Sequence, residues 1–187
     1  MLPLGTTAPD FSLPDTVSGS VVSLASLKGR KALLVMFICR HCPYVKHIQS
    51  ELARMGRDYA GRDMAFVAIT SNDAKAYPDD SPSSTKQMAE EVGFTFPVCF
   101  DETQETAKAY RAACTPDFFV FDAKRTLVYR GQLDDSRPGN GIPVTGKDLR
   151  AAIDAVLKGG PVDPRQKSSI GCNIKWKPGN EPDYFGR

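Results

Sequence analysis

The chain of 187 residues lacks several features that would assign it to a particular class of protein. Nowhere do about 18 apolar residues run together, so the sequence predicts no membrane-spanning helix. The N-terminus lacks the basic segment and apolar stretch of a secretory signal, which predicts a cytoplasmic protein. The sequence has neither a G-x-G-x-x-G nor a G-x-x-x-x-G-K-[ST] pattern, so no organic cofactor is predicted.

The sequence also lacks an excess of charge of one sign. Its net charge of +2 predicts that neither nucleic acid nor a membrane surface is a partner. The apolar fraction of 41% and the length suit one well-buried globular domain. In a reducing compartment, the five cysteines are expected to be catalytic, metal-binding or simply buried, rather than a structural disulfide framework.

The most informative motif is a C-R-H-C sequence at residues 39–42. The unbroken apolar residues 32–38 before it predict a buried strand, and the apolar spacing of residues 43–59 after it predicts a helix. A C-x-x-C between a strand and a helix is typical of thiol-disulfide redox proteins. Two cysteines three apart on a helix lie on one face, where their sulfurs can bond reversibly.

This placement predicts a role for each of the four residues. Cys39 is expected to be exposed at the helix N-terminus, where the helix dipole favours a thiolate and makes Cys39 the nucleophile. Arg40 and His41 are expected to tune the thiolate, because cationic neighbours lower the pKa of a thiol. Cys42, on the inner face of the helix, is expected to be the shielded partner that resolves a mixed disulfide.

The remaining pattern predicts an α/β fold with a sheet layered between helices. The expected strands are residues 10–13, 20–24, 32–38, 64–70, 95–100, 118–121 and 126–129, the first two forming a hairpin; the expected helices are 43–59, 82–92, 102–111 with Asp101 and Gln104 as a capping box, and 146–158. Residues 71–80 follow a central strand and either shape a substrate groove or form an ordinary insertion.

The C-terminal segment is predicted to be an extension that packs on the main domain. We place the domain at residues 1–159 and the extension at residues 160–187. In the extension, Ile170, Cys172, Ile174 and Trp176 alternate with polar residues, which is typical of a strand with one buried side.

Several motifs together resemble one superfamily. They are Ala8-Pro9-Asp10-Phe11, the C-x-x-C of Cys39 and Cys42, Asp101 with Ala107 and Tyr110, Thr115-Pro116-Asp117-Phe118-Phe119, and Gly171-Cys172-Asn173-Ile174-Lys175-Trp176-Lys177. The chain resembles the thioredoxin-like superfamily, in its peroxiredoxin-like and TlpA-like (AhpC/TSA) branch, and within it a bacterial subgroup. The resemblance implies a thioredoxin-like fold with a central mixed sheet. It also implies that Pro116 is a cis-proline facing the C-x-x-C, and that Thr115 and Pro116 bind a substrate's extended chain.

The sequence departs from the family pattern at several positions. Thioredoxin has a tryptophan before its first cysteine and a buried aspartate six before it, where this chain has Ile38 and Leu33. Proton transfer at Cys42 therefore needs another group or water. Peroxiredoxins have a proline and a threonine where this chain has Ala32 and Met36, which disfavours peroxide reduction. A histidine before the second cysteine is similar to disulfide isomerases and favours an oxidising potential.

The sequence leaves three functions open. The first is a thiol-disulfide oxidoreductase acting on protein or small-molecule disulfides and thiols, with electrons exchanged with another thiol system. The second is a peroxide reductase in which Cys39 becomes a sulfenic acid that Cys42 or Cys172 resolves. The third, from another class, is a copper or other metal carrier using Cys39, Cys42 and a histidine. Cys172 and Cys114 are each either an additional redox thiol or a packing residue.

Overall fold

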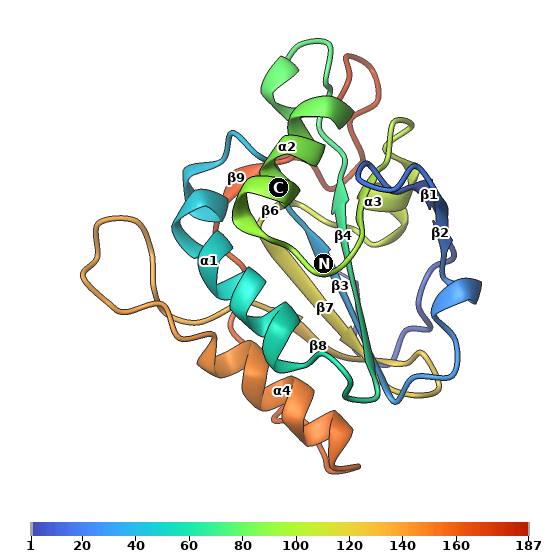
Figure 1. Cartoon of the computed structure of the whole chain (residues 1–187), viewed down its shortest axis with the longest axis vertical. Coiled ribbons are helices and arrows are strands. Elements are labelled where there is room, and N and C mark those ends of the chain that lie inside the picture. Colours follow the sequence, from blue (N-terminus) through green and yellow to red (C-terminus); the bar gives the residue numbers. More distant parts are fainter. Residues whose placement is uncertain (1, 187) are drawn as a thin grey trace.

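The centre of the computed structural model, which describes residues 2–186, is a mixed sheet of five strands in the order β5-β4-β3-β7-β8 (Figure 1). The strands are β3 (Ala32–Phe37), β4 (Met64–Thr70), β5 (Val98–Phe100), β7 (Asp117–Phe121) and β8 (Leu127–Gly131). Strands β3, β4 and β5 are parallel, whereas β7 is antiparallel to both β3 and β8. The predicted α/β fold with a central mixed sheet is confirmed.

Helices and loops cover the two faces of this sheet separately. Helices α1 (Pro43–Asp58), α2 (Pro82–Val92) and α4 (Lys147–Leu157) pack on one face. The other face is covered by α3 (Glu105–Ala109), by the N-terminal segment with its predicted hairpin of β1 (Ser12–Pro14) and β2 (Val21–Ser23), and by the C-terminal segment. Two 3₁₀ turns, Ala25–Leu27 and Pro78–Asp80, complete the described elements. None of the helices in residues 2–186 is long and apolar enough to cross a membrane.

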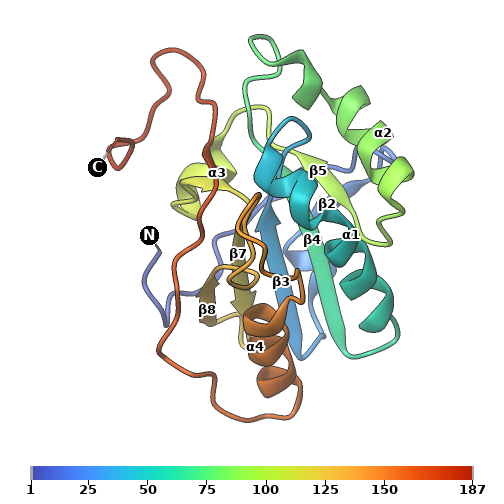
Figure 2. The same ribbon diagram turned by 90° about the vertical axis from the view of Figure 1, so that its left-hand side faces the viewer.

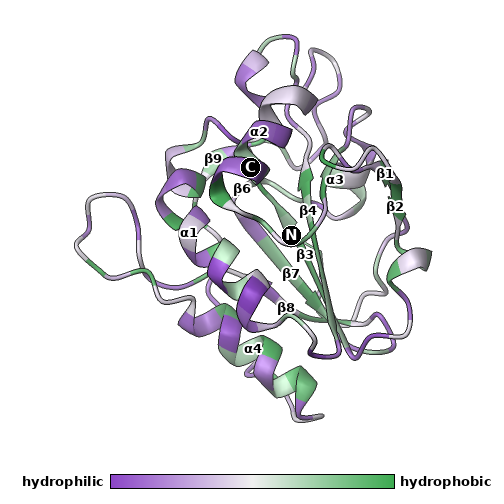
Figure 3. Ribbon diagram, in the orientation of Figure 1, coloured by the Kyte–Doolittle hydropathy of each residue, from purple (hydrophilic) through white to green (hydrophobic). Residues whose placement is uncertain are grey.

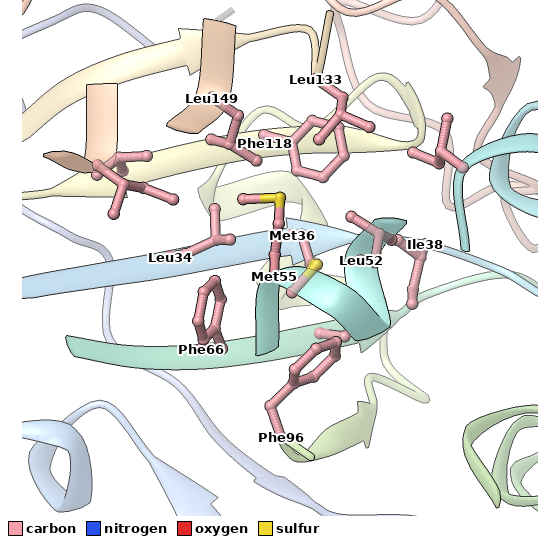
Figure 4. Close-up of a cluster of buried hydrophobic side chains, with 14 of the residues drawn as sticks. Leu34, Met36, Ile38, Leu52, Met55, Phe66, Phe96, Phe118, Leu133 and Leu149 are labelled. Atoms are coloured by element: carbon pink, nitrogen blue, oxygen red, sulfur yellow. The ribbon is translucent and has the colours of Figure 1, made fainter. Parts of the chain in front are cut away.

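The hydrophobic core follows from the alternation of side chains along β3, all six residues of which are buried. Leu34 and Met36 point toward α1, where they meet Leu52 and Met55, as Figure 4 shows. Leu33, Val35 and Phe37 point to the opposite face and its aromatic cluster around Tyr110. Figure 3 shows the same division, with hydrophobic strands between helices that are hydrophilic on one side.

The C-terminal segment, in orange and red in Figure 2, first passes along β8, to which Gln166 is hydrogen-bonded, and then reaches the sheet face opposite α1 and α2. Ile174 and Trp176 are buried in that face, as the alternation predicts. The predicted long strand is wrong, however, because only β9 (Cys172–Asn173) pairs, with β6 (Cys114–Thr115), and Ile170 is 55% exposed. Backbone groups of Lys167, Ile174, Lys175 and Lys177 bond to parts of the main domain instead.

Candidate active site

The C-x-x-C lies in the turn between β3 and α1, just before the helix rather than on it. Pro43 is the first residue of α1, where its missing N–H costs nothing, and Cys42 is the N-cap residue. The prediction that both cysteines share a helix face is therefore wrong. The prediction that Cys39 is exposed is also wrong, because Cys39 is 1% and Cys42 0% exposed.

Both sulfurs instead converge on one residue of a distant strand, Thr115. The Sγ of Cys39 lies 3.2 Å from the Thr115 hydroxyl, and the Cys42 thiol donates to the Thr115 carbonyl over 3.1 Å. The bond between Thr115 and Pro116 is cis, as the resemblance implies. All five cysteines are free thiols in this structure. The fold therefore brings two thiols and a strand end together from positions more than 70 residues apart.

Hydrogen bonding between the two thiols separates their pKa values. It lowers the pKa of Cys42 to about 4 and, together with burial and the negative charge of Asp80, raises the pKa of Cys39. The sulfurs thus share one proton, and the pair carries one negative charge at neutral pH. These shifts describe the state with the proton on Cys39. The hydrogen bonds to Thr115 favour the other state, with the proton on Cys42, because the Thr115 carbonyl can only accept a hydrogen bond and the Thr115 hydroxyl can donate to a thiolate on Cys39.

A buried carboxylate, Asp80, organises the turn around the cysteines. It is 0% exposed and accepts hydrogen bonds from the backbone N–H groups of Arg40 (2.8 Å) and His41 (3.1 Å) and from the Asn72 amide (2.8 Å). It also bonds Nδ1 of His41. No motif in the sequence points to Asp80. The one indication of a functional role for Asp80 is its position in residues 71–80, the loop that follows the carboxyl end of β4, where α/β sheets place functional residues.

The two residues between the cysteines differ in their orientation. The guanidinium of Arg40 turns toward α2, where it bonds the Ser84 carbonyl (2.9 Å) and Glu91 (3.2 Å), so any tuning of the thiolate by Arg40 would act without direct contact. The Nδ1 of His41 lies 3.9 Å from the Cys39 sulfur, and its ring stacks on Tyr77 at 5.5 Å. His41 is therefore the one residue of this pair that contacts the reactive sulfur.

Replacing Asp80 by asparagine is predicted to lower the pH at which Cys39 ionises. The negative charge of Asp80 raises the pKa of Cys39, and a neutral amide removes that charge at nearly constant volume. We expect a downward shift of about one pH unit, the scale on which one nearby charge acts. The measurement is the rate of iodoacetamide alkylation at Cys39 against pH, in a Cys42→Ser background so that Cys39 titrates alone. A matched Glu91→Gln variant should leave the midpoint unchanged, and an upward shift with Asp80→Asn would contradict this role.

The other cysteines occupy three different environments. Cys172 lies opposite Thr115 in the β6–β9 pair and is half-buried. Cys114, one residue before Thr115, turns its thiol to the Pro116 carbonyl at 3.6 Å, and burial raises its pKa. Cys99 is fully buried in β5. The structure thus brings Cys172 and Cys114 near the C-x-x-C and leaves Cys99 apart.

A metal-ligand set exists, but its members differ from those predicted. Ligand atoms of Cys39, His41 and Asp80 lie within 4.8 Å of one another. The predicted set used both cysteines, but the Cys42 sulfur turns to the Thr115 carbonyl instead. The second histidine, His47, bonds the Ser136 hydroxyl at 2.7 Å. Any metal would therefore displace the bond between His41 and Asp80.

The surface beside the site is nearly closed. A narrow cleft of about 20 Å³ adjoins Pro116 and is lined by Tyr44 and His47 of α1 and by Ser169 and Ile170 of the C-terminal segment. A wider cavity of about 800 Å³ lies between Pro14, Asp73 and Lys177, and its lining contains no cysteine. The narrow cleft, although small, is the one that adjoins the site.

Asp117, directly after the cis-proline, makes the stability of the protein depend on pH. Burial raises its pKa to about 6, although it accepts bonds from Ser169 and from backbone N–H groups. The folded protein therefore holds the Asp117 proton more tightly than the unfolded chain does. The resulting contribution to the free energy of unfolding is fully present below about pH 4 and is lost as the pH rises through about 6. At neutral pH the cost of ionising Asp117 is on the order of 3 kcal/mol.

Asp117→Asn, which keeps the site neutral, is predicted to be more stable than the wild type at neutral pH and equally stable near pH 4. Urea unfolding at both pH values measures the difference in free energy. A difference that does not change with pH would show that Asp117 is not the titrating group. The matched control is Asp163→Asn at an exposed position, where the pKa is lowered and the pH trend should not take this form.

Comparisons with known proteins agree with this architecture. Solved structures of an uncharacterized conserved protein from Geobacillus kaustophilus and of a hypothetical protein from Sinorhizobium meliloti 1021 are 60% and 53% identical, with TM-scores of 0.93 and 0.94. They cover 95% and 96% of this chain, and the matches span 94% and 97% of those chains.

A curated relative, the thiol-disulfide oxidoreductase ResA of Geobacillus kaustophilus, is 26% identical over 121 residues, which is 64% of this chain and 63% of that protein. The match thus spans less than two thirds of the length of this curated relative. The model of the AhpC/TSA family matches residues 4–130, which include the C-x-x-C, the cis-proline and the central sheet. The chain therefore belongs to the AhpC/TSA family, in the thioredoxin-like superfamily.

Proposed function

We propose that this protein is a thiol-disulfide oxidoreductase in which Cys39 and Cys42 form the redox pair. The observation that carries the proposal is the convergence of both sulfurs on Thr115, next to the cis-proline. A pair of thiols that share one proton supplies a thiolate at neutral pH, and the thiolate is the form that attacks disulfides. The name of the curated relative supports the same class of reaction.

Reduction of a substrate would proceed in two exchanges. With the shared proton on Cys42, the Cys39 thiolate attacks one sulfur of the substrate disulfide, whose S–S bond breaks to give a mixed disulfide and one substrate thiolate. Cys42 then loses its proton and attacks the Cys39 sulfur. The second substrate thiolate leaves, and the Cys39–Cys42 disulfide remains. The substrate gains two electrons, and an external dithiol returns them to the protein.

His41 and Asp80 would position the attacking sulfur. The carboxylate orients the imidazole through Nδ1 and holds two backbone N–H groups of the turn. The ring of Tyr77 stacks on the face of the imidazole. Thr115 and Pro116 would then contact the bound substrate, but β9 already pairs with Thr115, so an extended substrate chain at this edge would have to displace it.

The experiment that tests the proposal compares two substrates. The reduced protein should accelerate the reduction of insulin disulfides by dithiothreitol. Its reaction with hydrogen peroxide should be no faster than that of an unactivated thiol, because Ala32 and Met36 stand where peroxiredoxins have proline and threonine. Fast peroxide consumption without insulin reduction would overturn the proposal and favour the peroxidase alternative, to which membership of the AhpC/TSA family gives weight.

Metal carriage is a second candidate because Cys39, His41 and Asp80 form a ligand cluster. Carriage would require copper or zinc to protect Cys39 from alkylation. We expect no protection, because Nδ1 of His41 is already bonded to Asp80. Complete protection by one equivalent of metal would favour carriage instead.

A further inference from the structure

We propose that Cys172 is a third redox thiol, which takes over the disulfide of the Cys39–Cys42 pair by forming a Cys42–Cys172 bond. This inference rests on the proposed function. It assigns to the C-terminal segment a place in the reaction and not only in the packing.

The strand β9 places Cys172 directly opposite Thr115. In an antiparallel pair, residues opposite one another direct their side chains to the same side of the sheet, with Cβ atoms about 4.5–5.5 Å apart. Cys172 therefore shares a side with the Thr115 hydroxyl, which contacts Cys39. The neighbouring pair, Cys114 and Asn173, points to the opposite side.

Cys42 is the thiol that affects Cys172 directly. Cys172 packs against the core cluster that contains both Cys39 and Cys42. Of these two, Cys42 is the one whose thiol raises the pKa of Cys172, and the backbone of Cys172 in turn lowers the pKa of Cys42. The thiols of Cys39 and Cys42 both contact Thr115, and Cys172 lies opposite Thr115, so the three cysteines meet around this residue.

Several bonds hold the segment in this register. Asn72 accepts from the Lys175 N–H at 2.8 Å, and Gln104 accepts from the Lys177 N–H at 2.9 Å. The backbone of Gly171 lies so close to Thr115 that a Cβ at Gly171 would be 2.0 Å from the Thr115 carbonyl oxygen. A side chain cannot fit there, so glycine allows the segment to approach the redox pair.

The step is a disulfide exchange that needs no external oxidant. The Cys172 thiolate attacks the Cys42 sulfur of the Cys39–Cys42 disulfide. The bond between Cys39 and Cys42 breaks, the bond between Cys42 and Cys172 forms, and Cys39 leaves as a thiolate that takes up the proton lost by Cys172. One disulfide is conserved. It now includes a sulfur on a half-buried residue, whereas Cys39 and Cys42 are both fully buried.

The charge of the site favours this exchange only after the pair has been oxidised. In the reduced protein, burial and the negative charge that Cys42 shares with Cys39 raise the pKa of Cys172 to about 11, so Cys172 stays protonated. Once Cys42 is in a disulfide this shared charge is gone, whereas the Lys175 ammonium, which lowers the pKa of Cys172, remains. The thiol therefore becomes a better nucleophile when its target disulfide exists.

The test oxidises the full chain with glutathione disulfide, quenches it with acid and maps disulfides by peptide mass. In Cys39→Ser, most molecules should contain a Cys42–Cys172 bond. Gly171→Ala in the same background keeps both thiols but pushes the segment from Thr115, and should reduce the yield of that bond about tenfold. Tryptophan emission from Trp176 reports whether the segment stays docked.

A second readout uses the protein with all its cysteines. After oxidation to one disulfide, Cys39 should be alkylated in a fraction of molecules, and replacement of Cys172 by serine should abolish that fraction. Cys114→Ser is the matched control and should leave it unchanged. If the wild type forms Cys39–Cys42 but Cys39→Ser yields only glutathione adducts or a Cys42–Cys114 bond, this inference is wrong and the proposed function stands. If the wild type forms neither bond, both are wrong.

Discussion

Replacing Cys39 by serine is expected to lower the rate of disulfide reduction by roughly 1000-fold or more, the scale on which loss of a covalent nucleophile acts. Serine retains a contact with the Thr115 hydroxyl but cannot form a thiolate. The fold should persist, because a hydroxyl replaces a thiol of similar size beside a hydrogen-bonding partner. Insulin reduction by dithiothreitol, with and without the variant, measures the loss.

Two observations separate a chemical effect from a structural one. Cys99→Ala, at a buried cysteine outside the site, should keep the wild-type rate. Thermal unfolding should show similar stability for Cys39→Ser and the wild type. A Cys39→Ser protein that retains much of its activity would mean that Cys42 or Cys172 is the attacking thiol.

Replacing Cys42 by serine is expected to trap a mixed disulfide between Cys39 and the substrate. The second exchange requires a thiol within reach of the Cys39 sulfur, a role that the proposed mechanism assigns to Cys42, which meets Cys39 at Thr115. With Cys42 gone, the mixed disulfide should persist for hours instead of resolving within turnover. Non-reducing electrophoresis and peptide mass identify both the adduct and its position.

The reciprocal experiment decides the order of attack. The pKa of Cys42 is lowered to about 4, so Cys42 itself carries the thiolate when the shared proton is on Cys39. If Cys39→Ser traps substrate on Cys42 while Cys42→Ser traps none, the attacking thiol is Cys42 and the roles are exchanged. We expect the opposite result, because the Thr115 carbonyl accepts the proton of Cys42 and the Thr115 hydroxyl can donate to Cys39.

Local sequence patterns predicted the fold well. The unbroken apolar residues 64–70 became β4 without a change of bounds, because a strand buried on both faces must be apolar throughout. The helix expected at residues 82–92 is α2, with Ser81 capping its start and Gly93 in the left-handed conformation at its end. Such signals depend only on neighbouring residues, which is why the sequence reveals them.

The surroundings of the cysteines could not be predicted because they depend on contacts between distant segments. Asp80 reaches the turn at residues 39–42 from another loop, and no local pattern distinguishes it from Asp79 beside it. Arg40 turns toward α2 because Glu91 and the Ser84 carbonyl lie there. The burial of Cys39 likewise depends on Thr115, which is 76 residues away in the chain.

The redox equilibrium of the wild-type protein tests the central claim most directly. The protein would be equilibrated in glutathione buffers of graded potential, alkylated and digested with trypsin, which cuts after Arg40 and so separates Cys39 from Cys42 unless a disulfide joins their peptides. We predict a joined Cys39–Cys42 peptide and a two-electron midpoint between about −180 and −120 mV, because His41 stands before the second cysteine as in disulfide isomerases, which favours an oxidising potential. Cys39 and Cys42 peptides that are never joined at any potential would contradict the account.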